Sequence, residues 1–147
     1  MDQIALDKKP INLLQHASGA LPALQEVENW IANSSLDRDF VHLLKLRASQ
    51  MNECAYCVKM HTRDARDAGE KDERLDHLVI WRYSPQFSDA EKAALAWMEA
   101  MTSLKPAMDY GSLRGELRRH YDDAAIAALT LVGSMINLWN RVQVSNH

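Results

Sequence analysis

The feature that most restricts the fold of this chain is the scarcity of residues that interrupt a helix. Its 147 residues include only five Gly and four Pro, while helix-favouring Ala, Leu, Met, Glu and Arg are plentiful. The sequence therefore predicts an all-α protein. The length fits a single domain over residues 1–147, large enough to bury its own core.

Capping signals and apolar periodicity place the expected helices along the chain. Ser34 or Ser35 is the expected N-cap of the third helix and Asn52 of the fourth, while Ser88 and Glu91 form a capping box at the sixth. The expected helices cover about residues 11–18, 21–32, 36–50, 53–69, 72–83, 89–104, 110–120 and 123–144.

The last of these helices is apolar around most of its circumference. This pattern predicts burial on several sides and contact with another subunit. Its uncharged part, residues 124–140, is shorter than a typical membrane span and carries polar side chains, so no membrane association is predicted. The net charge of -3 provides no basic field for nucleic acid. The first residues lack the basic-then-apolar order of a signal peptide, and a cytoplasmic location is expected.

Both cysteines lie in a run of eight residues that also contains a histidine: Cys54, Cys57 and His61. On a helix these three side chains share one face. Two thiols this close can form a disulfide, and the imidazole can carry protons to or from them. An expected place in the first helical turn favours Cys54 as nucleophile, whereas the spacing of His61 favours Cys57. The spacing leaves the order of the two cysteines open.

Three interpretations of this face compete. The cysteines can be buried and inert, or they can bind zinc together with His61 and a further histidine such as His42. The third interpretation is a redox dithiol that cycles through a disulfide. In a reducing compartment a C-x-x-C pair is seldom a structural staple, and a full helical core does not need zinc. The redox dithiol without a bound metal is therefore the favoured prediction.

An extended string around the cysteines resembles the core motif of the AhpD-like alkylhydroperoxidases, within the carboxymuconolactone decarboxylase superfamily. The string is LKLRASQMNECAYCVKMHT, residues 44–62. Residues 63–70, 87–91 and 136–141 also match segments usual in this group, so the resemblance covers about residues 36–144.

The resemblance implies an all-α fold, a homo-trimer or homo-hexamer, and thiol-dependent reduction of hydroperoxides. By this likeness Cys57 attacks the peroxide, Cys54 resolves the sulfenic acid as a disulfide, and His61 belongs to the proton relay. The implied reductant is a dithiol on a lipoylated or thioredoxin-like protein, with no flavin or haem. The family's decarboxylases lack the cysteine pair, which favours the peroxidase branch. The alternatives are a decarboxylase-type enzyme, or a redox adaptor or oxidant sensor that relays electrons to a partner peroxidase.

The chain departs from the family pattern at two places. His42 stands twelve residues before the first cysteine, where the family has a glutamate in the relay. His42 can be a working base, a metal ligand, or a sign of weak peroxidase activity. Asn52-Glu53 replaces the usual Asn-Gly, and Glu53 is expected to be a first-turn partner of the helix dipole. Tyr56 is a candidate for the peroxide entrance, with packing as the alternative.

Overall fold

The computed structural model describes residues 5–147 and contains only helices and connecting turns in that range. The prediction of an all-α chain is confirmed. The helices are α1 (Leu13–His16), α2 (Leu21–Ala32), α3 (Arg38–Met51), α4 (Ala55–Asp67), α5 (Asp72–His77), α6 (Asp89–Ser103), α7 (Tyr110–Arg118) and α8 (Asp123–Val144), with 3₁₀ segments at Ser18–Ala20 and Leu78–Tyr83.

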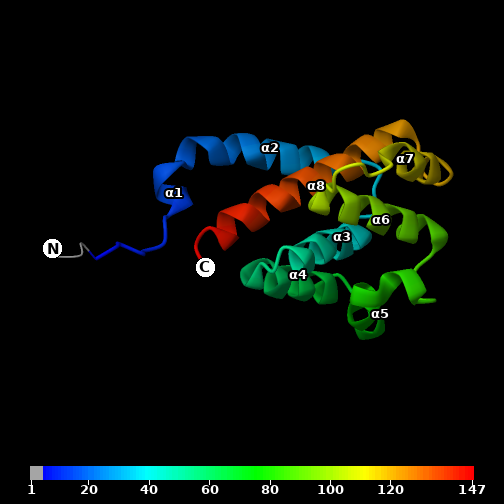
Figure 1. Cartoon of the computed structure of the whole chain (residues 1–147), viewed down its shortest axis with the longest axis horizontal. Coiled ribbons are helices and arrows are strands. Elements are labelled where there is room, and N and C mark those ends of the chain that lie inside the picture. The colour runs from blue at the N-terminus through cyan, green and yellow to red at the C-terminus, as the bar shows by residue number, and fades with distance from the viewer. Residues whose placement is uncertain (1–4) are drawn as a thin grey trace.

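The bundle is built around α3, α6 and α8, which all pack against one another (Figure 1). α4 lies against α3 and also touches α8, and α2 runs along the other side of α8. The core between these helices is formed by fully buried side chains such as Leu43, Leu46, Met98, Leu129 and Val132. α2, α3, α4 and α8 therefore meet around one region of the molecule.

α8 owes its apolar composition to this central position. Ala128, Leu129, Val132 and Ile136 are all buried by other helices of the same chain, whereas Leu131 is exposed. Burial on several sides is thus achieved within one chain, while the contact with a second subunit stays a prediction. α8 is also the one helix in the described range long and apolar enough to cross a membrane, yet 56% of its most apolar window is buried inside the protein.

Several predicted boundaries match the structure. α2 spans residues 21–32 as expected, Asp122 caps α8 by accepting the Ala125 N–H, and Ser88 and Glu91 form the predicted capping box. The predicted cap of the third helix was wrong. Asp37, not Ser34 or Ser35, accepts the first free N–H groups of α3.

Two predicted helices are shorter than expected. The first is only Leu13–His16, followed by a 3₁₀ turn. The helix expected over 72–83 ends at His77 and is followed by a 3₁₀ segment in which the backbone leaves helical geometry at Ile80 (φ -120°). A change of helix type of this kind leaves no mark in the apolar pattern.

Candidate redox site

The turn between α3 and α4 determines where the cysteines lie, and it differs from the prediction. α3 continues to Met51 and Asn52 is its C-cap, so Asn52 does not cap the cysteine helix. Its side-chain amide instead donates to the Oδ1 atoms of Asn137 and Asn140, each at 2.9 Å. This cluster of amides ties the turn to α8.

Glu53 follows with a positive φ of 52° and an exposed side chain. It therefore lies outside the helix, and the prediction that it is a first-turn residue was wrong. A left-handed residue other than glycine costs on the order of 1 kcal/mol. The position is one that a glycine fills without strain, in keeping with the Asn-Gly of the resembled motif.

Cys54 itself is the N-cap of α4. Its Sγ accepts the backbone N–H of Cys57 at 3.3 Å, and the two cysteines form a disulfide with their Cα atoms 5.3 Å apart. Cys54 was expected inside the first turn, whereas it lies one residue outside the helix. Because a cap stands where the free N–H groups converge, the sulfur still faces the positive end of the helix dipole.

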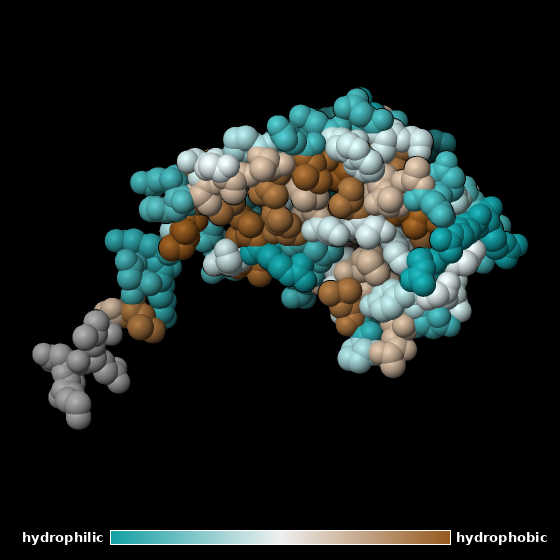
Figure 2. Space-filling model, turned by 90° about the horizontal axis from the view of Figure 1, so that it is seen from above, coloured by the Kyte–Doolittle hydropathy of each residue, from teal (hydrophilic) through white to brown (hydrophobic). Residues whose placement is uncertain are grey.

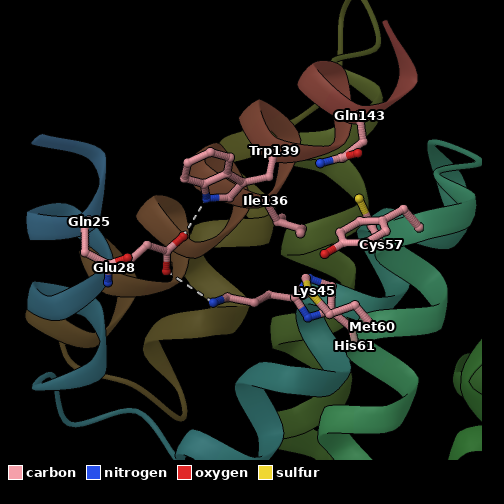
Figure 3. Close-up of a pocket in the computed structure, with 10 residues that line it drawn as sticks. Gln25, Glu28, Lys45, Cys57, Met60, His61, Ile136, Trp139 and Gln143 are labelled. Atoms are coloured by element: carbon pink, nitrogen blue, oxygen red, sulfur yellow. Dashed lines mark hydrogen bonds and ion pairs between the residues drawn. The ribbon is translucent and has the colours of Figure 1, made fainter. Parts of the chain in front are cut away.

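The two cysteines differ in their relation to one cavity of the described structure. A cavity of about 240 Å³ is lined by Cys57, but not by Cys54 (Figure 3). The other lining residues are Gln25, Glu28, Lys45, Tyr56, Met60, His61, Ile136, Trp139 and Gln143. Although the side chain of Cys57 is 1% exposed, it is the cysteine that a small molecule in this cavity meets.

His61 follows Cys57 by one turn of α4 and lines the same cavity. It is 7% exposed. Burial, and after it the positive charge of Lys45, lower the pKa of His61 from 6.5 to about 4. His61 is therefore a neutral imidazole at neutral pH, with one nitrogen able to accept a proton.

The low pKa of His61 predicts a loss of stability in acid. The unfolded chain binds a proton at His61 near pH 6.5 and the folded chain only near pH 4, so stability falls as the pH decreases through this window. Between about pH 7 and about pH 5 we expect a loss of about 2 kcal/mol. Urea unfolding in metal-free buffer measures it. His61→Gln should remove most of this dependence, and an equal dependence in the variant would contradict the prediction.

His42, on α3, lies close to His61. One ring nitrogen of each histidine and one carboxylate oxygen of Asp64 lie within 4.8 Å of one another. His42 lines an adjoining cavity of about 230 Å³, which shares Gln25, Glu28 and Lys45 with the first. The structure thus brings His42 to His61, while its role stays a prediction. Because both sulfurs are in the disulfide, the Cys₂His₂ zinc alternative has no thiolate ligands in this state.

The site also contains a carboxylate that the sequence did not indicate. Glu28, on α2, accepts a hydrogen bond from Trp139 Nε1 at 2.9 Å and pairs with Lys45 Nζ at 3.2 Å (Figure 3). Glu28 and Lys45 line both cavities. No spacing in the sequence relates Glu28 to the cysteines, because α2 reaches them only through the packing of the bundle.

Tyr56 lines the cavity beside Cys57 and is 57% exposed. Its place at the cavity agrees with the predicted entrance, and a role in substrate binding remains a prediction.

Comparison with known proteins places this site in a family. The sequence model of the "Carboxymuconolactone decarboxylase family" matches residues 17–100. The chain is 34% identical over 135 residues to the uncharacterised protein YdfG of Bacillus subtilis, covering 92% of each chain. It is 33% identical over 105 residues to the uncharacterised protein YnjA of Escherichia coli, covering 71% of this chain and 57% of the relative.

Solved structures show the same architecture. A protein of unknown function from Agrobacterium tumefaciens, provisionally described as the antioxidant defence protein AhpD, superposes with a TM-score of 0.85 at 35% identity over 94% of both chains. A peroxidase-related protein from a Silicibacter species gives a TM-score of 0.78 over 88% of this chain and 69% of its own, and at 22% identity it supports the fold alone. With a family model that matches more than half of its length, the chain belongs to the carboxymuconolactone decarboxylase family.

Proposed function

We propose that the protein is a cytoplasmic antioxidant enzyme that reduces hydroperoxides through its cysteine pair. The observation that carries the proposal is that Cys57 and a neutral His61 line the same cavity, while a disulfide joins Cys57 to Cys54. The likeness to a structure provisionally described as AhpD supports the same conclusion.

The geometry favours Cys57 as the peroxide-attacking residue. In the reduced protein His61 takes the thiol proton of Cys57, and the thiolate attacks the terminal oxygen of the hydroperoxide. The S–O bond forms as the O–O bond breaks, and the departing alkoxide takes the proton from His61 to leave as an alcohol. Cys57 is then a sulfenic acid.

Cys54 completes the oxidation. As a thiolate it attacks the Cys57 sulfur, the S–S bond forms, and the hydroxyl group leaves as water after gaining a proton. The short separation of the two Cα atoms, 5.3 Å, suits this step. The order agrees with the one implied by the family resemblance, and helix-dipole activation of Cys54 then serves the resolving step.

Two electrons from a dithiol return the enzyme to its starting state. Because the cavity is lined by Cys57, an incoming thiolate attacks this sulfur and releases the Cys54 thiolate. The second thiol of the reductant then displaces Cys57 and leaves as a disulfide. We assign this role to a lipoylated or thioredoxin-like protein, and the cycle requires no flavin, haem or metal.

The proposed enzyme is a homo-trimer or homo-hexamer. The face that carries α2 and α8 has a band of hydrophobic residues between hydrophilic edges (Figure 2). Trp30 on α2 is 53% exposed. Exposed apolar area of this kind suits a subunit contact.

The direct test of the proposed function is a single turnover. The protein is reduced with a dithiol, separated from it, and mixed with one equivalent of an organic hydroperoxide. We expect one equivalent of alcohol, the loss of both free thiols, and a mass lower by two hydrogens. Two thiols and an unconsumed peroxide after mixing would refute the proposal.

Replacement of His42 tests the departure from the family pattern. We expect His42→Ala to lower the rate of peroxide reduction by about 10²-fold, the lower range for a general base, and His42→Glu to restore it. The glutamate variant should recover activity because it rebuilds the carboxylate of the family relay at this position. Stopped-flow measurement across pH gives both results. An unchanged rate and pH profile in His42→Ala would reduce His42 to a packing residue.

A further inference from the structure

Three side chains beside the disulfide form a cluster that the proposed cycle does not fully use. His42 comes from α3, and His61 and Asp64 come from one face of α4, where they are three residues apart. The ligand-type atoms of all three lie within 4.8 Å of one another.

Both imidazoles of the cluster have an unsatisfied nitrogen. The Nδ1 atoms of His42 and His61 are buried and have no hydrogen-bond partner among the described residues. The whole His61 residue is only 7% exposed. Buried polar atoms are almost always paired, so two histidines that each have an unpaired buried nitrogen, clustered with one carboxylate, point to a ligand that accepts lone pairs.

We propose that His42, His61 and Asp64 bind a divalent transition-metal ion of the zinc type and that the bound ion inhibits the peroxidase reaction. Two imidazoles and a carboxylate are the ligands such ions prefer, whereas Mg²⁺ and Ca²⁺ prefer oxygen ligands. Metal–ligand bonds of about 2.0–2.1 Å bring tetrahedral ligand atoms to roughly 3.4 Å from one another. The separations of up to 4.8 Å therefore shorten by at most about 1.4 Å on binding, within the reach of side-chain rotation.

The charges around the cluster permit a cation. The ammonium group of Lys45 is the strongest opposing charge acting on His61, but Glu28 pairs with it at 3.2 Å. Asp64 contacts Arg63 only at 3.5 Å, and the Arg63 side chain is 68% exposed. The Asp64 carboxylate is therefore only weakly paired and can serve as a ligand.

The inhibition part of the proposal rests on the proposed function. A neutral imidazole has one nitrogen that accepts either a proton or a metal ion. When the metal occupies that nitrogen of His61, His61 cannot take the thiol proton of Cys57. The metal-bound form is then an inhibited form of the enzyme.

Cobalt(II) tests binding without any turnover. The oxidised protein is titrated with CoCl₂, because its disulfide removes thiolate ligation and Co²⁺ reports on its ligands through visible absorption. We expect saturation at one Co²⁺ per chain. His42→Ala and His61→Ala should abolish the saturable signal. Asp64→Asn, which keeps the shape of a partly exposed side chain and so preserves the fold, should weaken binding at least tenfold. His16→Ala, at an exposed histidine of α1, is the matched control and should bind as the parent does.

The absence of a saturable signal, or equal binding by Asp64→Asn, overturns the metal site and leaves the proposed function untouched. Inhibition is measured separately on the reduced protein with ZnCl₂, each variant against its own metal-free rate. Zinc should inhibit Asp64→Asn at least tenfold less potently than the parent. Equal inhibition of both would assign the effect to the thiols and overturn the regulatory part. If neither protein reduces peroxide, the proposed function fails while the cobalt result still stands.

Discussion

Replacing Cys57 by serine is expected to abolish peroxide reduction, leaving only the rate measured without protein. Cys57 is the cysteine that lines the cavity, and a hydroxyl group cannot be converted to a thiolate-like nucleophile at neutral pH. Cys54→Ser should behave differently, since the attacking thiol remains. One equivalent of peroxide should be consumed in a single turnover, leaving a sulfenic acid at Cys57 that dimedone traps and mass spectrometry locates.

Serine is the suitable replacement at Cys54 because it is itself a strong N-cap. In Cys54→Ser the introduced hydroxyl group keeps an acceptor near the Cys57 N–H, so the variant changes the chemistry with little effect on α4. The reverse pattern, with Cys57→Ser trapping a sulfenic acid at Cys54, would show that the helix terminus rather than the histidine selects the nucleophile.

Loss of the imidazole at His61 should reduce the rate of peroxide reduction by about 10²–10⁴-fold, the range for a positioned general base. His61→Gln keeps a polar side chain of similar reach but cannot exchange a proton. The effect should shrink at high pH, where thiols lose their proton to the solvent without a protein base. Stopped-flow rates across pH measure it.

The matched control for this substitution is His16→Gln, because His16 is exposed on α1 and far along the chain from the cysteines. It should retain the parent rate. Formation of the disulfide by a thiol-specific oxidant should also be normal in His61→Gln, because that reaction does not require reduction of a peroxide. A parent-like pH profile in His61→Gln would remove His61 from the relay.

Local features of the sequence were sufficient for much of the fold and for the pairing of the cysteines. The bounds of α2 and the Ser88–Glu91 capping box follow from residues only a few positions apart. The disulfide likewise joins cysteines three positions apart, whose close approach depends on one turn of backbone. Contacts between residues within one turn can be predicted because both partners lie close together in the sequence.

Features that depend on tertiary packing could not be predicted in this way. Asn52 has the residue type of an N-cap, but its amide is used by Asn137 and Asn140 more than eighty residues later. Glu28 enters the site through the packing of α2, and its partners Lys45 and Trp139 lie on two other helices. The sequence also does not show how many helices of the same chain surround the apolar circumference of α8.

The hydrogen bond that caps α4 should change in strength with the oxidation state of the cysteine pair. The same Cys54 sulfur that takes part in the disulfide accepts the Cys57 N–H. A thiolate is a stronger acceptor than a neutral disulfide sulfur, so reduction tightens the first turn of α4 and oxidation loosens it. Deuterium uptake at the Cys57 amide should therefore be slower in the reduced protein. Hydrogen exchange at this one amide would then report whether the cysteine pair is reduced or oxidised.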